Sequence, residues 1–475
     1  MKKLALHWKI LIAMVLGVVF AILSMKFGWN KFTADWVDPF GKIFINVLKL
    51  IAVPLVLFSI ITGVAGMGDP SKLGRIGAKT LGLYLVTTVS SIGIGLLLVN
   101  TFAPGVQSNE KSRVHHRLQY ELWAEESATK IIDGRHELKT ASAEQIAKAT
   151  EAYSGSKNKK EYKAAAEKRD KAEAAGDTGA APGPLKALVD MVPSNIFVAM
   201  ANGRLMLQVI FFALLFGISM AFLPKEKTGA VFDFFTGMNE IFIKMVNIIM
   251  KGAPFFVFCL MAGVLARSAG SLDELMDIFI RLLGYSLLVV AGLGLLMFAF
   301  YPLLLRIFGV KIGYKKFFNG MSPAQFLAFS TSSSAATLPV TIKCVNENLG
   351  VPEESTDFVL PIGATVNMDG TSLYQAVAVI FLAQYFDVDL TIGQQMGIVV
   401  TATLASIGAA AVPGAGLIML MIVLESIGLN PMWVAIILPM DRILDMCRTV
   451  INVTSDATVA AVVAKSEKMK FKGEE

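Results

Sequence analysis

The feature that most constrains this chain is the length of its uncharged runs. Leu282 to Leu305 contains no Asp, Glu, Lys or Arg, and neither does Thr80 to Asn109. A helix of about 20 apolar residues crosses a hydrocarbon core of about 30 Å. Over the 475 residues, 55% are apolar and 17% are charged, whereas about 25% are charged in a soluble globular domain. The sequence therefore predicts an all-α polytopic membrane protein and excludes a soluble one.

The basic residues predict the orientation of the chain. In helical membrane proteins, Lys and Arg collect in the cytoplasmic loops. With the N-terminus inside, the alternation of spans places Lys72, Arg75 and the tail after Lys465 in the cytoplasm, and the acidic turn at Asp273 outside. We therefore expect a multi-pass protein of the plasma (inner) membrane with both termini cytoplasmic. The net charge of +6 then belongs to the loops and does not indicate a nucleic-acid partner.

The apolar runs predict six straightforward spans, at residues 6–28, 42–68, 78–103, 190–223, 231–266 and 278–306. Between the third and the fourth lies a charged extracytoplasmic insert, residues 104–186, rich in Ala, Lys and Glu. Its stretches 141–152 and 160–174 favour helix but have no sustained apolar stripe. Two interpretations stay open: a docking or regulatory module, and a surface insertion that the fold tolerates.

Two later segments do not fit ordinary spans. Thr391 to Leu424 is uncharged and would be about 51 Å long as one helix, but S-I-G-A-A-A-V-P-G-A-G, residues 406–416, interrupts it. The run S-T-S-S-S-A-A-T-L-P-V-T, residues 330–341, is equally poor material for a helix interior. We expect a re-entrant hairpin at each, because irregular backbone at membrane depth survives only inside protein or beside a polar cavity. Hairpin plus helix then occurs twice, at 313–386 and 391–466, as in the inverted repeats of secondary transporters.

The last predicted helix carries a polar stripe: Asp441, Asp445, Arg448, Asn452 and Asp456. At 100° per residue these side chains fall within about 80° of arc. Each charge at bilayer depth costs roughly 2.5–3.5 kcal/mol, and such residues usually mark a pathway or a site. A structural ion-pair network would explain Arg448 against one carboxylate, but it leaves surplus negative charge. That surplus calls for bound cations.

A second break, T-V-N-M-D-G-T at residues 365–371, interrupts the preceding helix. Its Asn367 and Asp369 supply oxygen ligands, and of the four histidines of the chain three lie in the insert and His7 stands at the start of the first predicted span. Oxygen ligands without imidazole or thiolate suit a hard cation such as sodium. The alternative for this motif is a satisfied polar kink.

Together, S-S-S-A-A-T-L-P-V-T, T-V-N-M-D-G-T, the 406–416 tip and D-R-I-L-D-M-C-R-T-V-I-N-V-T-S-D closely resemble the glutamate transporter family, the dicarboxylate/amino acid:cation symporters. The resemblance covers nearly the whole chain except the insert. It implies eight transmembrane helices, two re-entrant hairpins, a homotrimer embedded in lipid, and a transport domain that moves like an elevator against a scaffold. The implied division is scaffold at 1–77 and 187–277, transport-domain helix three at 78–103, the insert at 104–186, and transport domain with cytoplasmic tail at 278–475.

The resemblance also implies the residues of the substrate site. Arg448 resembles the arginine that pairs with the side-chain carboxylate of the substrate, and Asp445 the acid that takes its ammonium group. Asn452 and Thr371 resemble residues that help to orient the substrate. The remaining implied contacts are Ser333, Ser334, Val412, Gly416 and Thr449.

The resemblance implies three sodium sites, with Na+ as the coupling ion. The first is Asp456 with carbonyls of Gly363, Asn367 and Asn452. The second consists of carbonyls of Thr365, Ser406, Ile407 and Ala409. The third is Tyr84, Thr87 and Thr88 with Asn367 and Asp369.

We therefore expect a sodium-coupled symporter of acidic amino acids, L-glutamate or L-aspartate, and not an enzyme. One alternative is a proton-coupled C4-dicarboxylate symporter of the same family, whose members tend to lack the acids that match Asp445 and Asp456. Another is a gated ion channel, because rings of polar residues can line pores. An intramembrane hydrolase is disfavoured because no histidine lies near the serine run to activate a nucleophile.

Overall fold

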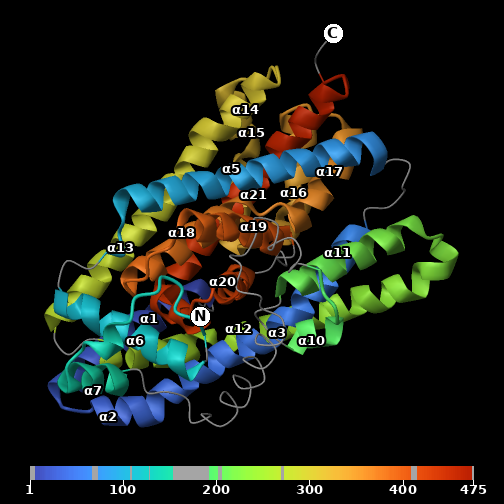
Figure 1. Ribbon diagram of the computed structural model, residues 1–475. Coiled ribbons are helices and arrows are strands. Elements are labelled where there is room, and N and C mark those ends of the chain that lie inside the picture. The colour runs from blue at the N-terminus through green and yellow to red at the C-terminus, as the bar shows by residue number, and fades with distance from the viewer. Residues whose placement is uncertain are drawn as a thin grey trace, which may run out of the picture.

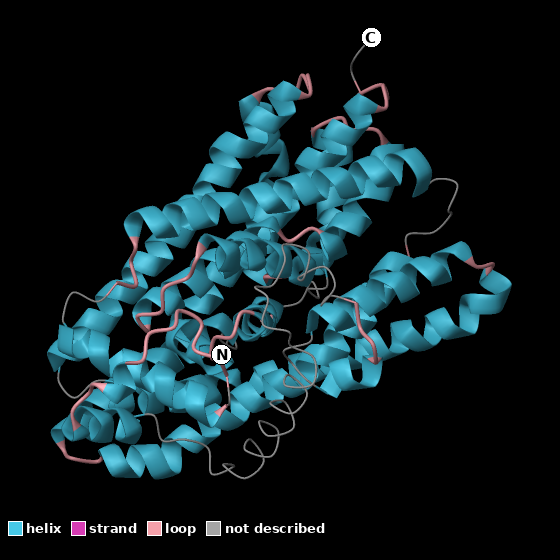
Figure 2. Ribbon diagram, viewed as in Figure 1, coloured by secondary structure: helices cyan, strands magenta, loops and turns pink. Residues whose placement is uncertain are grey.

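The computed structural model describes residues 6–66, 73–106, 110–127, 129–152, 192–201, 206–268, 272–407 and 414–472. Within these ranges every regular element is a helix and no strand occurs (Figure 2). Four helical runs there are long and apolar enough to cross a membrane: Asn30–Ala65, Arg75–Phe102, Glu226–Gly263 and Met276–Ile307. The prediction of an all-helical membrane protein is confirmed at this level.

One group of helices is organised around α12 (Lys225–Ser268). This helix packs along α1 (Leu6–Lys26) and α3 (Asp38–Ala65) (Figure 1). α11 (Met206–Phe222) also packs on α3. Gly17 of α1 lies against the backbone of α12, where a Cβ would meet Phe258 O at 2.8 Å. The shorter elements of this group are α2 (Asn30–Phe32), the π-helical turn η1 (Thr33–Val37) and α10 (Ile196–Ala201).

The spans predicted for this part correspond to helices of somewhat different length. Spans 6–28 and 42–68 correspond to α1 and α3, and span 231–266 lies within the longer α12. Of span 190–223 the structure describes α10 and α11 as helices, and residues 202–205 between them lie outside the described ranges.

The second group surrounds α18 (Asp369–Tyr385) and α21 (Val434–Ser466). α18 packs along α21 and along α5 (Ala78–Phe102), the long helix that crosses the upper part of Figure 1. α13 (Leu272–Leu295), the π-helical turn η5 (Leu296–Phe300) and α14 (Tyr301–Ile307) follow one another without a gap and cover the predicted span 278–306. A π-helical turn, η2 (Leu73–Gly77), precedes α5.

Both predicted hairpins form pairs of helices. The first consists of α15 (Tyr314–Thr331) and α16 (Ser334–Lys343), with Ser332 between them at a left-handed φ of 52°. Ser333 caps α16, because its Oγ accepts a hydrogen bond from Ala336 N at 3.2 Å. The break therefore lies in the serine run and not at Pro339, which is inside α16.

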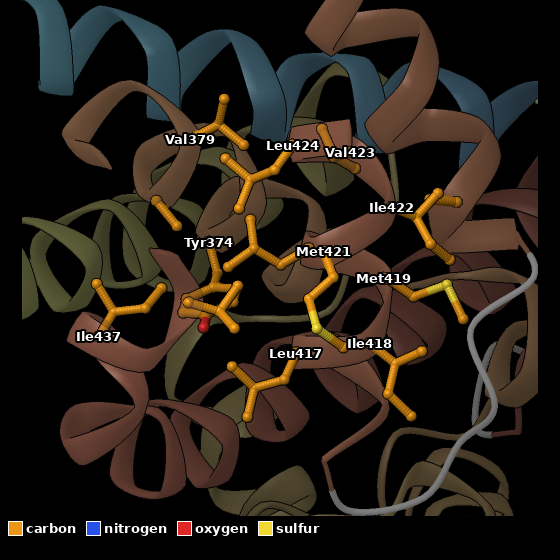
Figure 3. Packing of buried hydrophobic residues seen from close by; sticks show 14 of the residues in the cluster. Tyr374, Val379, Leu417, Ile418, Met419, Met421, Ile422, Val423, Leu424 and Ile437 are labelled. Atoms are coloured by element: carbon orange, nitrogen blue, oxygen red, sulfur yellow. The ribbon is translucent and has the colours of Figure 1, made fainter. Parts of the chain in front are cut away.

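The second hairpin consists of α19 (Ile392–Ile407) and α20 (Ala415–Ser426), with residues 408–413 of its tip outside the described ranges. Gly414, at a φ of 84°, leads into α20. Every residue of α20 from Ala415 to Leu424 is buried. Figure 3 shows Leu417 and Met421 of α20 in one apolar cluster with Tyr374 and Val379 of α18 and Ile437 of α21.

The helix before the second hairpin is broken, as predicted from T-V-N-M-D-G-T. α17 (Glu353–Val366) ends at Asn367, whose backbone is extended, and α18 begins again at Asp369. A π-helical turn, η6 (Cys344–Asn348), follows α16 directly and precedes α17. A short 3-10 turn, η7 (Pro431–Trp433), directly precedes α21. Asn430 caps η7, since its Oδ1 accepts from Met432 N at 2.9 Å.

The first half of the insert is packed against the second group. It forms α6 (Glu110–Glu126), a 3-10 turn η3 (Glu137–Lys139) and α7 (Ala143–Ala152), while the predicted helix at 160–174 lies outside the described residues. Arg117 of α6 is fully buried and donates to Asp133 at 2.7 and 2.8 Å, to Glu121 at 2.8 Å and to the carbonyl of Asp387 at 3.0 Å. Asp387 follows α18, so this backbone hydrogen bond and a partly exposed ion pair between Arg113 and Asp387 at 3.2 Å attach α6 to that helix end.

Aromatic rings complete this contact between the insert and the second group. His116 lies 4.5 Å from the ring of Tyr385, and Tyr120 lies 5.8 Å from Trp433, which stacks on Phe386 at 3.9 Å. The described part of the insert therefore packs on the ends of α18 and η7 through α6, while α7 contacts α12. Both interpretations of the insert stay predictions.

Candidate functional site

The polar stripe of α21 faces the protein interior. Asp441, Asp445, Arg448, Asn452 and Asp456 are all buried, with Arg448 completely inaccessible. α21 packs against α18, α17 and both helices of the first hairpin, so the stripe lies where the two breaks predicted from the sequence meet. Because burial of unpaired charge is costly, each of these groups requires a partner.

Arg448 is positioned by two carboxylates and one aromatic ring. Its Nη2 donates to Asp441 Oδ1 at 3.0 Å and to Asp445 Oδ1 at 2.8 Å. The guanidinium carbon lies 3.8 Å from the centre of the Tyr374 ring, a cation–π contact. Its Nε and Nη1 are buried, and no acceptor from the described part of the chain is in hydrogen-bond reach of either. A guanidinium that keeps unused N–H donors is suited to bind a carboxylate.

The second hairpin covers this guanidinium. A Cβ on Gly416 would lie 3.0 Å from Arg448 Nη1, so only a residue without a side chain allows this approach. The backbone N–H of Gly414 donates to Asp445 Oδ2 at 3.2 Å. The start of α20 therefore contacts both charged members of the pair.

The sequence suggested that Arg448 would pair with one carboxylate, but the charges on α21 are paired differently in the structure. Arg448 bonds two acids, and Arg442 Nη1 adds an ion pair at 3.6 Å to Asp445 Oδ2. Asp441 and Asp445 are thus balanced by two arginines. The surplus negative charge is located at Asp456 and, on α18, at Asp369.

Asp369 is surrounded by hydroxyl groups. Oδ1 accepts from Thr87 at 3.1 Å and from Thr88 at 2.9 Å, while Oδ2 accepts from Tyr301 at 3.1 Å and from Ser455 at 2.6 Å. A hydroxyl that donates its hydrogen keeps two lone pairs. The side chain is completely buried, so this is an oxygen-rich site inside the helical core.

Asp456 joins α21 to the break between α17 and α18. Asn367 Nδ2 donates to Asp456 Oδ1 at 2.7 Å, and Asn452 Oδ1 accepts from the backbone N–H of Gly370 at 2.9 Å. A Cβ on Gly363 would collide with Asp456 Oδ1 and with the Tyr84 hydroxyl. The carboxylate, the amide and the phenol thus converge on one point of α17.

Neither Asp369 nor Asp456 has an ion-pair partner among the described residues, whose buried pairs on α21 involve only Asp441 and Asp445. Asn367 Oδ1 is also buried without a hydrogen-bond donor from the described ranges. Carboxylate, amide and hydroxyl oxygens form the ligand set that hard cations prefer. This part of the site can hold alkali metal ions.

The other predicted residues are placed as follows. Thr449 Oγ1 donates to the carbonyl of Asp445 at 2.8 Å, and Thr371 is buried with its Oγ1 4.0 Å from Met368 Sδ. Ser333 and Ser334 lie at the start of α16, which packs on α21.

The predicted second sodium site is only partly described. The Thr365 hydroxyl donates to Ile362 O at 3.0 Å, and the Ser406 hydroxyl donates to Thr403 O at 2.8 Å. Ile407 is the last residue of α19. Ala409 of this site and Val412 of the substrate site lie outside the described residues.

Three side chains of the site had not been singled out from the sequence. Tyr301 and Ser455 donate to Asp369, and Tyr374 lies under Arg448. Ser455 is next to Asp456 in sequence, which was a usable signal. No pattern connects Tyr301 to a carboxylate 68 residues away, because that contact depends on how α14 packs.

Comparisons with known proteins agree with this geometry. The sequence profile described as "Sodium:dicarboxylate symporter family" matches residues 6–466. A proton/sodium-glutamate symport protein of Geobacillus stearothermophilus is 32% identical over 98% of this chain and 96% of its own length. The proton/glutamate-aspartate symporter of Escherichia coli (strain K12) is 32% identical over 98% and 93%, respectively. Excitatory amino acid transporter 3 of Oryctolagus cuniculus is 34% identical over 98% and 86%.

Proposed function

Because this chain belongs to the sodium:dicarboxylate symporter family, we propose that it is a secondary symporter that carries an acidic amino acid, L-glutamate or L-aspartate, across a membrane together with sodium ions. The observation that supports this most directly is the division of charge in the site. Two buried carboxylates, Asp369 and Asp456, have no cationic partner among the described side chains, while a buried guanidinium, Arg448, keeps two donor nitrogens without a described acceptor.

Arg448 binds the side-chain carboxylate of the substrate in this proposal. Its Nε and Nη1 are buried donors without an acceptor among the described residues, and a carboxylate can accept from them. Tyr374 and Asp441 hold the group from the other sides, so its orientation is fixed before substrate arrives. A neutral amino acid would leave these buried N–H donors without an acceptor, which is costly.

Asp445 binds the ammonium group of the substrate. It lies one helical turn from Arg448, and its Oδ2 faces the start of α20. Asn452, Thr371 and Thr449 orient the substrate beside it. Backbone of the two hairpins at Ser333, Ser334, Val412 and Gly416 holds the main-chain carboxylate.

Sodium ions balance the remaining carboxylates. One ion is held by Asp456 with carbonyls of Gly363, Asn367 and Asn452. A second is held among Tyr84, Thr87, Thr88, Asn367 and Asp369. A third is held by carbonyls of Thr365, Ser406, Ile407 and Ala409. Coupling would run through the two asparagines: Asn367 donates to Asp456, and Asn452, which lies between Arg448 and Asp456 on α21, accepts from the Gly370 amide.

Transport then requires the site to open to one side of the membrane at a time. The two hairpins are the gates, and α5 with residues 278–466 moves as a transport domain against a scaffold of residues 1–77 and 187–277. The proposed assembly is a homotrimer with eight transmembrane helices per chain, embedded in lipid with both termini cytoplasmic. The packing of the helices into two groups supports such a division (Figure 1).

Proton coupling is the second candidate, because the names of the relatives mention protons as well as sodium. The oxygen-rich surroundings of Asp369 favour sodium, since a carboxylate that only takes up a proton needs no cage of hydroxyls. Uptake of radiolabelled L-aspartate into proteoliposomes, driven either by a sodium gradient or by a pH gradient without sodium, separates the two. We expect saturable uptake with the sodium gradient. Uptake that does not saturate with substrate would indicate a channel.

A further inference from the structure

Arg442 is a charged residue of the site that the proposed function does not use. It lies on α21 three residues before Asp445 and is 9% exposed. We propose that Arg442 is a positioning residue for substrate binding: it holds the Asp445 carboxylate where the substrate's ammonium group must meet it, and it makes the site selective for acidic over neutral amino acids. This inference rests on the proposed function.

The geometry around Asp445 divides its two oxygens between two sets of donors. Oδ1 accepts from Arg448 at 2.8 Å. Oδ2 accepts from the Gly414 amide at 3.2 Å and lies 3.6 Å from Arg442 Nη1. Arg442 therefore fixes the oxygen that Arg448 does not touch, on the side of the second hairpin.

Among the described residues, Asp445 is the acid that forms an ion pair with Arg442. Its Nε and Nη1 are buried, and no hydrogen-bond acceptor from those residues reaches them. The group borders a cavity of about 30 Å³ between α1, α3 and α12 on one side and α20 and α21 on the other. Within the described lining, Asp441 and Asp445 are the acids, and the rest is apolar or glycine apart from Arg442 itself. Its ion pair with Asp445 is what makes this buried position tolerable.

The four charges also set the net charge of the site. Asp441 and Asp445 are balanced by Arg442 and Arg448. Without Arg442 the set would carry one net negative charge, and an acidic amino acid is itself a net monoanion. Arg442 removes that repulsion. A neutral amino acid, which has no net charge, gains less from it.

Arg442 acts through Asp445 and the local potential, so its removal should change affinity more than turnover.

The test uses the full chain in proteoliposomes and measures KM and maximal rate of L-aspartate uptake at saturating sodium. For Arg442→Gln we expect KM to rise about tenfold or more with maximal rate changed by about twofold or less, because a buried charge contact is lost. Arg442→Lys keeps the charge and should stay within about threefold of the wild-type KM. Arg306→Gln, an exposed arginine at the end of α14, is the matched control and should leave KM unchanged.

Coupling to Asp445 is tested by a double-mutant cycle on L-aspartate binding to the purified protein. If Arg442 acts mainly through Asp445, Arg442→Gln should weaken binding less in the Asp445→Asn background than in the wild type. Should the Gln variant fail to elute as folded protein, Arg442→Met matches the apolar lining and replaces it.

Three outcomes would overturn the proposal: a wild-type KM in the neutral variants, an equal loss in Arg442→Lys and Arg442→Gln, or additive effects in the cycle. If the wild-type protein itself fails to take up acidic amino acids, the proposed function fails instead.

Discussion

Asn367 and Asp456 lie 89 positions apart, yet the amide of one donates to the carboxylate of the other at 2.7 Å in a fully buried environment. This bond joins the break in the α17–α18 segment to the stripe on α21. The preceding polar residue of the stripe, Asn452, accepts from the Gly370 amide on the other side of the break, so α21 is bonded to both sides of that break.

Replacement of the Asp456 carboxylate should weaken sodium binding. In Asp456→Asn, a neutral amide takes the place of a carboxylate ligand, so the sodium concentration for half-maximal uptake should rise about tenfold or more. Initial uptake rates at a series of sodium concentrations measure this. Asp357→Asn, an exposed acid on α17, is the control. An unchanged sodium dependence in Asp456→Asn would remove this residue from the ion site.

A methyl group at position 363 of α17 should displace the Asp456 carboxylate of the same site. Gly363→Ala places a Cβ where Asp456 Oδ1 and the Tyr84 hydroxyl lie, so both must shift. We expect reduced sodium affinity and a lower melting temperature of the purified protein. At Gly93 of α5 a Cβ meets nothing within 4 Å, and Ala there should be neutral or stabilise by about 0.4–1 kcal/mol. Equal behaviour of the two variants would contradict the packing around Gly363.

The sequence was most informative where one helix contains the whole pattern. The stripe on α21 followed from spacing, because residues three and four apart share a face of a helix, and the breaks at 367–368 and 332–333 followed from Asn, Gly and serine content. The use of a single nitrogen of Arg448 for both Asp441 and Asp445 did not follow, since rotamers depend on neighbours such as Tyr374.

The insert was harder to interpret from sequence for a specific physical reason. α6 has no apolar stripe, and ion pairs and aromatic rings hold it in place instead. From sequence, Arg117 and Glu121 are expected to be solvent-exposed, but both side chains are fully buried in the structure. Their partners, Asp133 and the carbonyl of Asp387, are remote in sequence or belong to the backbone.

Removal of Arg117 should release the docked part of the insert. Arg117→Met leaves Glu121 and Asp133 buried without their cation, and loss of one partner of a buried pair costs about 3–5 kcal/mol. Limited proteolysis should then cut within residues 110–152 much faster than in the wild type. Lys130→Met, at an exposed position, should not change the cleavage rate. Protection that survives in Arg117→Met would show that the rings alone hold α6.

Acid should release the same segment. Burial, with a smaller effect of neighbouring His115, lowers the pKa of His116 from 6.5 to about 3. Burial alone would raise the pKa of Asp133, but hydrogen bonds from Arg117 outweigh it and hold that pKa below its usual value. A group with a depressed pKa stabilises the folded state fully above its unfolded pKa and loses that contribution as the pH falls.

The stability of the docked insert should therefore decrease between about pH 6.5 and pH 3, first through His116 and then through Asp133. Hydrogen exchange of residues 110–127 as a function of pH measures this. In His116→Phe the decrease above pH 4 should disappear, since the ring contacts with Tyr385 remain but no proton is taken up. A pH profile identical to wild type in this variant would assign the effect elsewhere.

The most direct test of sodium-coupled acidic amino-acid transport is the uptake of radiolabelled L-aspartate into proteoliposomes under an inward sodium gradient, for the wild type and for Arg448→Ala. We predict saturable, sodium-dependent uptake by the wild type and its loss in Arg448→Ala, because the substrate's side-chain carboxylate then has no guanidinium to bind. Wild-type uptake that runs on a pH gradient without sodium, or acidic uptake that is unchanged in Arg448→Ala, would contradict the account.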